Sequence, residues 1–125
     1  MPRFIAIIYI ALFSPFCTAI LAADAHATDN QAVDAARGKV VATVRCMPCH
    51  HLDSHARSIG PGLKGVYGRA PTIIGVPFEV WDDAALEAWL SGPRKIKPNT
   101  RMSMPSIAAR DRADLIAYFK SDVGK

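Results

Sequence analysis

Two cysteines and a histidine near the middle of the chain constrain its fold more than any other feature. Residues 46–50 form a C-x-x-C-H motif, in which Cys46 and Cys49 stand about one helical turn apart. Two thiols at this spacing can each add to one of two vinyl groups on the same side of a porphyrin, and His50 can then reach its iron. A chain that carries such a group is expected to fold around it.

Two other interpretations of the paired cysteines fit this sequence less well. A redox dithiol places C-x-x-C beside a strand–helix–strand unit, and no stretch here shows convincing strand alternation. A structural zinc site takes four ligands, usually as two separated pairs, whereas His51 and His55 lie too close along the chain to complete one. The motif therefore predicts one covalent haem c, attached through Cys46 and Cys49, with His50 as an iron ligand.

The first two dozen residues are typical of an export signal. Arg3 gives a positive start, residues 4–23 are almost wholly apolar, and small residues follow. Cleavage fits after Ala23, Ala25 or Ala27. The apolar run is long for a signal peptide, which leaves an uncleaved membrane anchor as the alternative.

This interpretation divides the chain into three parts. We expect a signal peptide at 1–23, a flexible polar lead-in at 24–33 and a single domain at 34–125. Once the signal is removed, roughly 100 residues remain, and a domain of that size buries only a modest core. A bound cofactor would help to organise it. Export would place the mature protein in a bacterial periplasm, and a retained anchor would hold it at the membrane.

The domain is predicted to be all-α, with three to four helices and long loops around the haem. Small and β-branched residues recur at helical spacing from about Asp34 to Val44, and the Asp34 carboxylate can cap the helix start. Gly38 lies inside this run. Because glycine weakens a helix, we expect another backbone to pass close to it.

A second helix is predicted to begin at Asp82 or Asp83 and to end at Gly92-Pro93. Residues 94–105 are predicted to be a loop.

The last helix carries the clearest amphipathic pattern. Asp111 can cap it, and Asp114 stands three residues later, near the positive end of the helix dipole. Leu115, Ile116 and Phe119 share one face, as in an amphipathic helix.

The sixth coordination position of the iron separates an electron carrier from an enzyme. Met102 and Met104 lie in a basic, proline-bounded segment, and a thioether is a neutral ligand that raises the reduction potential. We predict that one of them binds the iron; the alternative is that both only pack. His26, His51 and His55 are expected to be surface residues.

Several short motifs occur in an order that characterises one family. They are Gly38-Lys39, eight residues before Cys46; residues 60–63, close to G-P-x-L; residues 65–69, close to G-x-[FY]-G-R; Trp81, twelve residues before Pro93; residues 98–102, close to P-G-T-K-M; and residues 113–120, close to A-D-L-I-A-Y-L-K. In these motifs the chain resembles the class I cytochromes c, which include the mitochondrial protein and soluble bacterial carriers. The resemblance implies the cytochrome c fold.

The resemblance also implies roles for individual residues. The Pro61 carbonyl would receive the second ring N–H of His50 and orient that ligand. Arg69, Trp81 and Thr100 would lie near the haem propionates, where a guanidinium, an indole N–H and a hydroxyl can pair with carboxylates. For Trp81, plain core packing is the alternative.

Within the methionine segment, the family register selects Met102 as the sixth ligand. A Met-Pro pair, which some other bacterial cytochromes use, would select Met104 instead. Trp89 stands where the family has a haem-pocket tyrosine, and Ile96 replaces another family tyrosine.

The resemblance implies a one-electron carrier that works between redox partner proteins. The formal net charge is +4, and a positive rim near the haem edge would steer an acidic partner such as a dehydrogenase, reductase or oxidase. The candidate rim residues are Lys64, Arg69, Arg94, Lys95, Lys97 and Arg101. No nucleic-acid recognition motif is present.

Two other functions remain open at this point. One is a haem-bearing subunit of a specific periplasmic dehydrogenase, which would make the protein part of a heterodimer rather than a monomer. The other is a peroxidase-type haem enzyme, which would require an open or labile sixth position.

Overall fold

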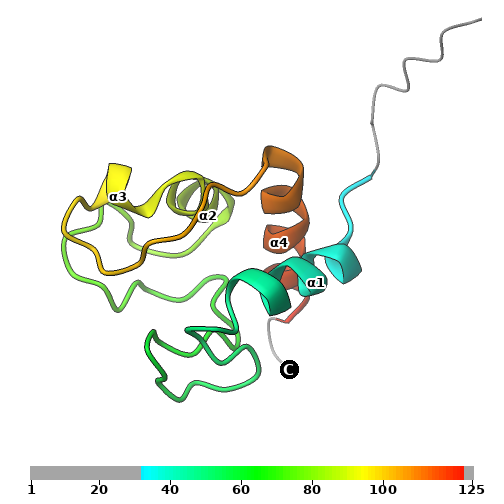
Figure 1. Ribbon diagram of the computed structural model, residues 1–125, viewed down its shortest axis with the longest axis horizontal. Helices are drawn as coiled ribbons and strands as arrows, with labels where there is room; N and C mark the ends of the chain where they lie inside the picture. The colour runs from blue at the N-terminus through cyan, green and yellow to red at the C-terminus, as the bar shows by residue number, and fades with distance from the viewer. Residues whose placement is uncertain (1–31, 123–125) are drawn as a thin grey trace, which may run out of the picture. The chain divides into compact units, whose positions relative to one another are not determined.

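The computed structural model describes residues 32–122, which belong to the unit Gln31–Lys125. The helices are, in chain order, α1 (Ala35–Arg45), α2 (Asp83–Ser91), α3 (Pro93–Ile96) and α4 (Ala109–Ser121). Long segments without regular structure, 46–82 and 97–108, connect them (Figure 1). Residues 32–122 contain no strand, which confirms the all-α prediction.

Part of the sequence interpretation lies outside the described residues. This applies to the signal peptide predicted at 1–23, to most of the lead-in predicted at 24–33, and to His26. Every helix within 32–122 is too short or too polar to cross a bilayer.

The first and last helices, α1 and α4, cross and pack against each other (Figure 1). A Cβ atom on Gly38 would lie 1.9 Å from the backbone oxygen of Asp114, so only glycine permits this approach. The expected close passage of another backbone at Gly38 is therefore confirmed. Ala42 on α1 and Leu115 on α4 have no exposed surface, as expected for the centre of a packed core.

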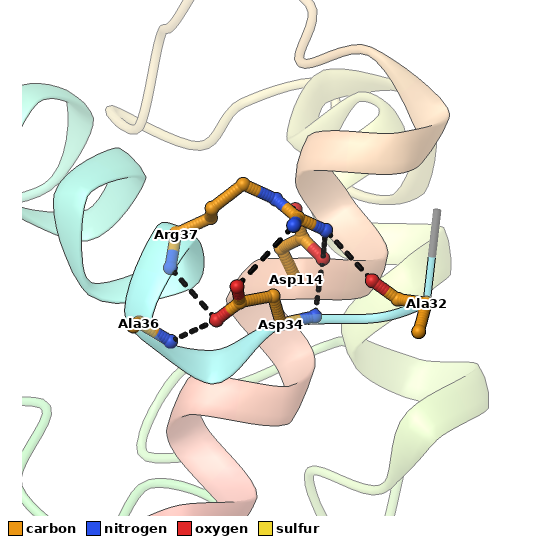
Figure 2. Close-up of polar contacts among 5 residues, drawn as sticks. All are labelled: Ala32, Asp34, Ala36, Arg37 and Asp114. Carbon is orange, nitrogen blue, oxygen red and sulfur yellow. Dashed lines mark hydrogen bonds and ion pairs between the residues drawn. The ribbon is translucent and has the colours of Figure 1, made fainter. Parts of the chain in front are cut away.

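A cluster of polar contacts fixes the start of α1 (Figure 2). The Asp34 carboxylate accepts the backbone N–H groups of Ala36 and Arg37, which confirms it as the N-cap. The backbone N–H of Asp34 donates to Asp114 across the crossing, at 2.7 Å. The guanidinium of Arg37 contacts both oxygens of Asp114, at 2.8 and 3.0 Å, and the carbonyl of Ala32. The chain ahead of α1 is thus tied to α4.

The predicted start of the last helix was wrong. Helix α4 begins at Ala109 with Ala108 as its N-cap and has no side-chain cap. Ala109 and Arg110 are strong helix formers, so the helix extends beyond Asp111, which lies in the first turn. Asp114 does not serve the helix start either: it is 1% exposed and faces the guanidinium from α1.

The region around α2 follows the sequence prediction with one exception. The Asp82 carboxylate accepts the N–H of Ala85, and α2 ends before Gly92, as expected. The stretch predicted to be a loop instead begins inside the one-turn helix α3. Pro93 occupies its first turn, where a fixed φ favours the helix, and the N–H of Lys97 closes it onto the Pro93 carbonyl at 2.8 Å.

The core joins three helices to the long connecting segments. From the helices it takes Ala42, Ala85, Leu86, Trp89, Leu90, Leu115, Ile116 and Phe119, and from the connections Cys46, Val66, Trp81 and Ile107. Because large side chains of the irregular segments pack against the helices, these segments form the walls of the site.

Candidate functional site

A cavity of about 600 Å³ lies between the segment that follows α1 and the segment that holds the methionines. Its volume falls in the range of cofactor pockets. Cys46, Cys49 and His50 line it together with Met102 and Met104, although the two groups are more than fifty residues apart in the sequence.

The C-x-x-C-H motif continues the last turn of α1. Cys46 is the C-cap of the helix, and its carbonyl accepts the N–H of Cys49 at 3.0 Å and of His50 at 2.9 Å. This turn brings two thiols and an imidazole to the same wall of the cavity. Both cysteines are free, Cys46 buried and Cys49 exposed, so both thiols are available for thioether bonds.

The electrostatics of Cys46 differ from those of a redox-active cysteine. Burial, and to a smaller extent the neighbouring Cys49, raise the pKa of the Cys46 thiol to about 11. Reactive cysteines in dithiol enzymes have a lowered pKa, because the thiolate is the nucleophile. The site therefore does not have the character of a dithiol oxidoreductase.

One hydrogen bond orients the His50 ring. Its Nδ1 donates to the Pro61 carbonyl at 2.7 Å, which leaves Nε2 with its lone pair free for a metal. A Cβ atom on Gly60 would lie 2.2 Å from the ring atom Cε1 of His50, so this approach requires glycine. The N–H of Gly60 donates in turn to the Cys49 carbonyl at 2.7 Å, which fixes the loop against the motif.

On the methionine segment, Met102 is held at two points. Its backbone N–H donates to the Thr100 hydroxyl at 3.2 Å, and its sulfur accepts the indole N–H of Trp89 at 3.1 Å. Met102 and Met104 are both half-buried against the core. The contact between Trp89 and Met102 was not predicted from the sequence, because residues thirteen apart on a helix and a loop give no periodic signal.

The structure places Arg69, Trp81 and Thr100 around the same cavity. The guanidinium of Arg69 donates to the Gly62 carbonyl at 2.8 Å and contacts Nδ1 of His55 at 3.2 Å. His55 is exposed, as expected, but it also lines the cavity.

Trp81 is buried, and two backbone hydrogen bonds, with Gly68 and Arg69, hold its position. Its ring packs at 5.6 Å from that of Trp89 and at 5.5 Å from that of Phe78.

The charged side chains that line the cavity within residues 32–122 are all cationic. They are Arg45, Arg57, Arg69, Lys97 and Arg101. Such a lining favours an anionic cofactor or partner. The sequence did not predict that Arg45 and Arg57 line the cavity. For Arg45, its position directly before Cys46 was a usable signal; for Arg57 the sequence offered none.

These features fit a haem c. The cavity offers two free thiols, an imidazole nitrogen, a thioether and an excess of positive charge for the two propionates. Trp81, Leu86, Leu90 and Phe119 supply apolar walls for the porphyrin.

Comparison with known proteins decides the family. The family model described as cytochrome c matches residues 35–122, which include the whole cavity wall. The chain belongs to the cytochrome c family. It therefore carries a covalent haem c and is an electron-transfer protein, not an enzyme, so the peroxidase-type alternative is dropped.

Several cytochromes c are similar to this chain. Cytochrome c of Euglena viridis is 39% identical over 98 residues, which cover 70% of this chain and 96% of the relative. Cytochrome c2 iso-2 of Magnetospirillum fulvum is 34% identical over 86 residues, 61% of this chain and 90% of the relative. The solved structure of cytochrome cH from Methylobacterium extorquens aligns with a TM-score of 0.57 and 32% identity, over 70% of this chain and 98% of that one. These similarities confirm the predicted cytochrome c fold.

Proposed function

We propose that this cytochrome c is an exported carrier of single electrons, whose haem is attached through Cys46 and Cys49 and ligated by His50 and Met102. The observation that carries this proposal is the convergence of the C-x-x-C-H turn and the Met102 thioether on one cavity. The haem supplies an iron that alternates between the ferric and ferrous states.

The chain's own residues have three tasks in such a carrier. The Pro61 carbonyl keeps the His50 ring in one tautomer and one orientation. The hydroxyl of Thr100 and the indole of Trp89 hold Met102 from its backbone and from its sulfur. Because both ligands stay fixed, little rearrangement accompanies the transfer of an electron.

The carboxylates of the cofactor need partners if they are buried. We propose Arg69, Trp81 and Thr100 for this role, since all three line the cavity. Arg69 is already held by the Gly62 carbonyl, so its guanidinium is presented in a fixed orientation.

The mature protein is proposed to be a periplasmic monomer that begins between residues 24 and 28, after removal of the signal. Arg94, Lys95 and Arg101 are exposed near the methionine segment. Together with the cationic cavity lining, they favour an acidic redox partner, whose approach they would accelerate at low salt.

Visible spectroscopy of two variants tests the axial ligation. Ferric protein with Met102→Ala should lose the weak absorption band near the red end that marks a methionine–Fe(III) bond. Met104→Ala should keep this band, because the Met104 sulfur is not the ligand. Loss of the band in the Met104 variant alone would contradict the assignment.

A further inference from the structure

The side chain of Arg112 joins three parts of the molecule. Arg112 belongs to α4, and its guanidinium donates from Nε to the Glu87 carboxylate of α2 at 2.8 Å. From Nη1 it also donates to the backbone carbonyl of Ile107. Ile107 lies near the end of the methionine segment, residues 97–108, and is 2% exposed. One planar group therefore connects α2, α4 and the segment that carries both methionines.

The two halves of the methionine segment are held differently. In the first half, the N–H of Thr100 donates to the Lys97 carbonyl at 3.0 Å. The N–H of Met102 then donates to the Thr100 hydroxyl at 3.2 Å. Beyond Met102, the bond from Arg112 is the one hydrogen bond to residues 103–107 within the part of the chain that the structure describes. The second half therefore depends on a single polar contact and on the packing of its own side chains.

Glu87 determines where the Arg112 guanidinium points. An arginine fork carries several N–H donors and no acceptor, and its long side chain has many rotamers. The Glu87 carboxylate contacts Nε and Nη2, which leaves Nη1 directed at the Ile107 carbonyl. The Arg112 side chain is 16% exposed, so the pair is better shielded from water than an ion pair on the open surface. A charge-assisted bond in such a place holds its donor firmly.

The geometry points to Glu87 as a positioning residue that, through Arg112, keeps the methionine segment closed over the cavity. While the ion pair holds, the second half of the segment stays anchored and Met102 remains at the cavity wall. When the pair is weakened, the segment opens more often and Met102 leaves its place. The pair thus sets how readily an outside ligand enters the sixth position. This inference rests on the proposed ligation by Met102.

Binding of imidazole to the ferric holoprotein measures this opening. Imidazole can reach the sixth position only after Met102 has left it. The apparent affinity for imidazole therefore scales with the open fraction, and the binding rate levels off at the rate of opening. Glu87→Gln keeps the size of the side chain and removes its charge. We expect this variant to bind imidazole about three- to tenfold more tightly, with a faster limiting rate, because a charge-assisted hydrogen bond becomes a neutral one.

A second ion pair between α2 and α4 supplies the matched control. Asp83 of α2 pairs with Lys120 of α4 at 3.1 Å, and its carboxylate also accepts the hydroxyl of Tyr67. Within residues 32–122, no hydrogen bond joins Asp83 or Lys120 to the methionine segment. Asp83→Asn therefore weakens the contact between the same two helices without releasing the segment. It should leave the affinity for imidazole and the limiting rate unchanged.

Two further measurements complete the test. Arg112→Lys keeps the positive charge but loses the fork that serves Glu87 and Ile107 together, so it should bind imidazole as Glu87→Gln does. Amide hydrogen exchange of residues 103–107 should accelerate in both variants and not in Asp83→Asn. Unchanged imidazole binding in Glu87→Gln, or an equal gain in Asp83→Asn, would overturn the role of Glu87. A ferric parent protein without the methionine band near the red end would instead refute the ligation on which the inference rests.

Discussion

At His50, the hydrogen bond to the Pro61 carbonyl and the close approach of Gly60 determine which ring nitrogen stays free. The 2.7 Å hydrogen bond to Pro61 exists only because Gly60 has no side chain. We expect Gly60→Ala to displace the ring or the loop and to lower stability by about 1–3 kcal/mol, the usual cost of overpacking. The yield of haem-loaded protein and its denaturant unfolding would measure this.

A matched glycine provides the control for this substitution. A Cβ atom on Gly92 would meet only the flexible side chain of Lys95, at 3.1 Å or more. Gly92→Ala should therefore leave haem attachment and stability nearly unchanged. Equal effects of the two substitutions would show that the approach of Gly60 to His50 is not special.

Single residues differ in how far the sequence predicted them. Cys46 and Cys49 stand in a motif whose spacing follows from covalent chemistry, so the residues alone were enough to predict the attached haem. The role of Pro61 needed the family resemblance, because a carbonyl acceptor leaves no mark in the sequence. The contact of Trp89 with Met102 required the fold, since it depends on how α2 faces the methionine segment.

At the scale of elements, the crossing of α1 and α4 depends on one buried carboxylate. Asp114 receives the Asp34 N–H and the Arg37 guanidinium (Figure 2). Asp114→Asn keeps the shape but removes the charge, and we expect it to cost about 2 kcal/mol, typical of a hydrogen bond to a charged group. Asp111 is half-buried in the first turn of α4, and Asp111→Asn should cost roughly 0.5 kcal/mol through the helix dipole. Chemical denaturation of both variants would compare them.

The same carboxylate gives stability a pH dependence. The hydrogen bond from Arg37 holds the pKa of Asp114 below its ordinary value. A group whose pKa is lowered by folding stabilises the protein above its unfolded pKa, and this contribution is lost as pH falls through the folded pKa.

The Asp114→Asn variant should therefore lose less stability than the parent protein when the pH is lowered from 6 to 3. Denaturant midpoints are measured at each pH on both proteins with the same haem content. The difference between the two curves gives the contribution of the Asp114 carboxylate to the pH dependence of stability. Parallel curves would mean that the Asp114 carboxylate is not paired in the folded protein.

The sequence predicted the three longer helices, but not every helix boundary. Asp34 and Asp82 mark helix starts because their carboxylates accept backbone N–H groups, and both assignments were correct. Asp111 was chosen by the same rule and was wrong, because Ala109 and Arg110 extend α4. The one-turn helix α3 escaped prediction because four residues are too few to show a period.

At the scale of the whole molecule, positive charge gathers around the cavity. We expect the ferrous protein to reduce an anionic oxidant such as ferricyanide more slowly as salt is added, because screening removes the attraction. A cationic cobalt complex should react faster under the same change. Stopped-flow kinetics at several ionic strengths would test both.

Two lysine variants localise this effect. Lys97 lines the cavity, whereas Lys39 is exposed on α1 and is not part of the lining. Lys97→Gln should lower the rate with ferricyanide and its salt dependence more than Lys39→Gln does. Equal effects would mean that only the net charge matters.

The sequence predicted the fold class and family but not the shape of the site. Helical periodicity and the motif order were sufficient for an all-α cytochrome c. The cavity walls, by contrast, come mainly from segments 46–82 and 97–108, whose course depends on contacts between residues far apart in the chain. The cationic lining that includes Arg57 became visible only in three dimensions.

The most direct test of the account is the intact mass of the protein purified from the exported fraction. We predict a polypeptide that begins between residues 24 and 28 and carries the mass of one covalently bound haem. Replacement of both Cys46 and Cys49 by serine should abolish the added mass. An exported polypeptide without a haem, or one that keeps its haem in the double variant, would contradict the central claim.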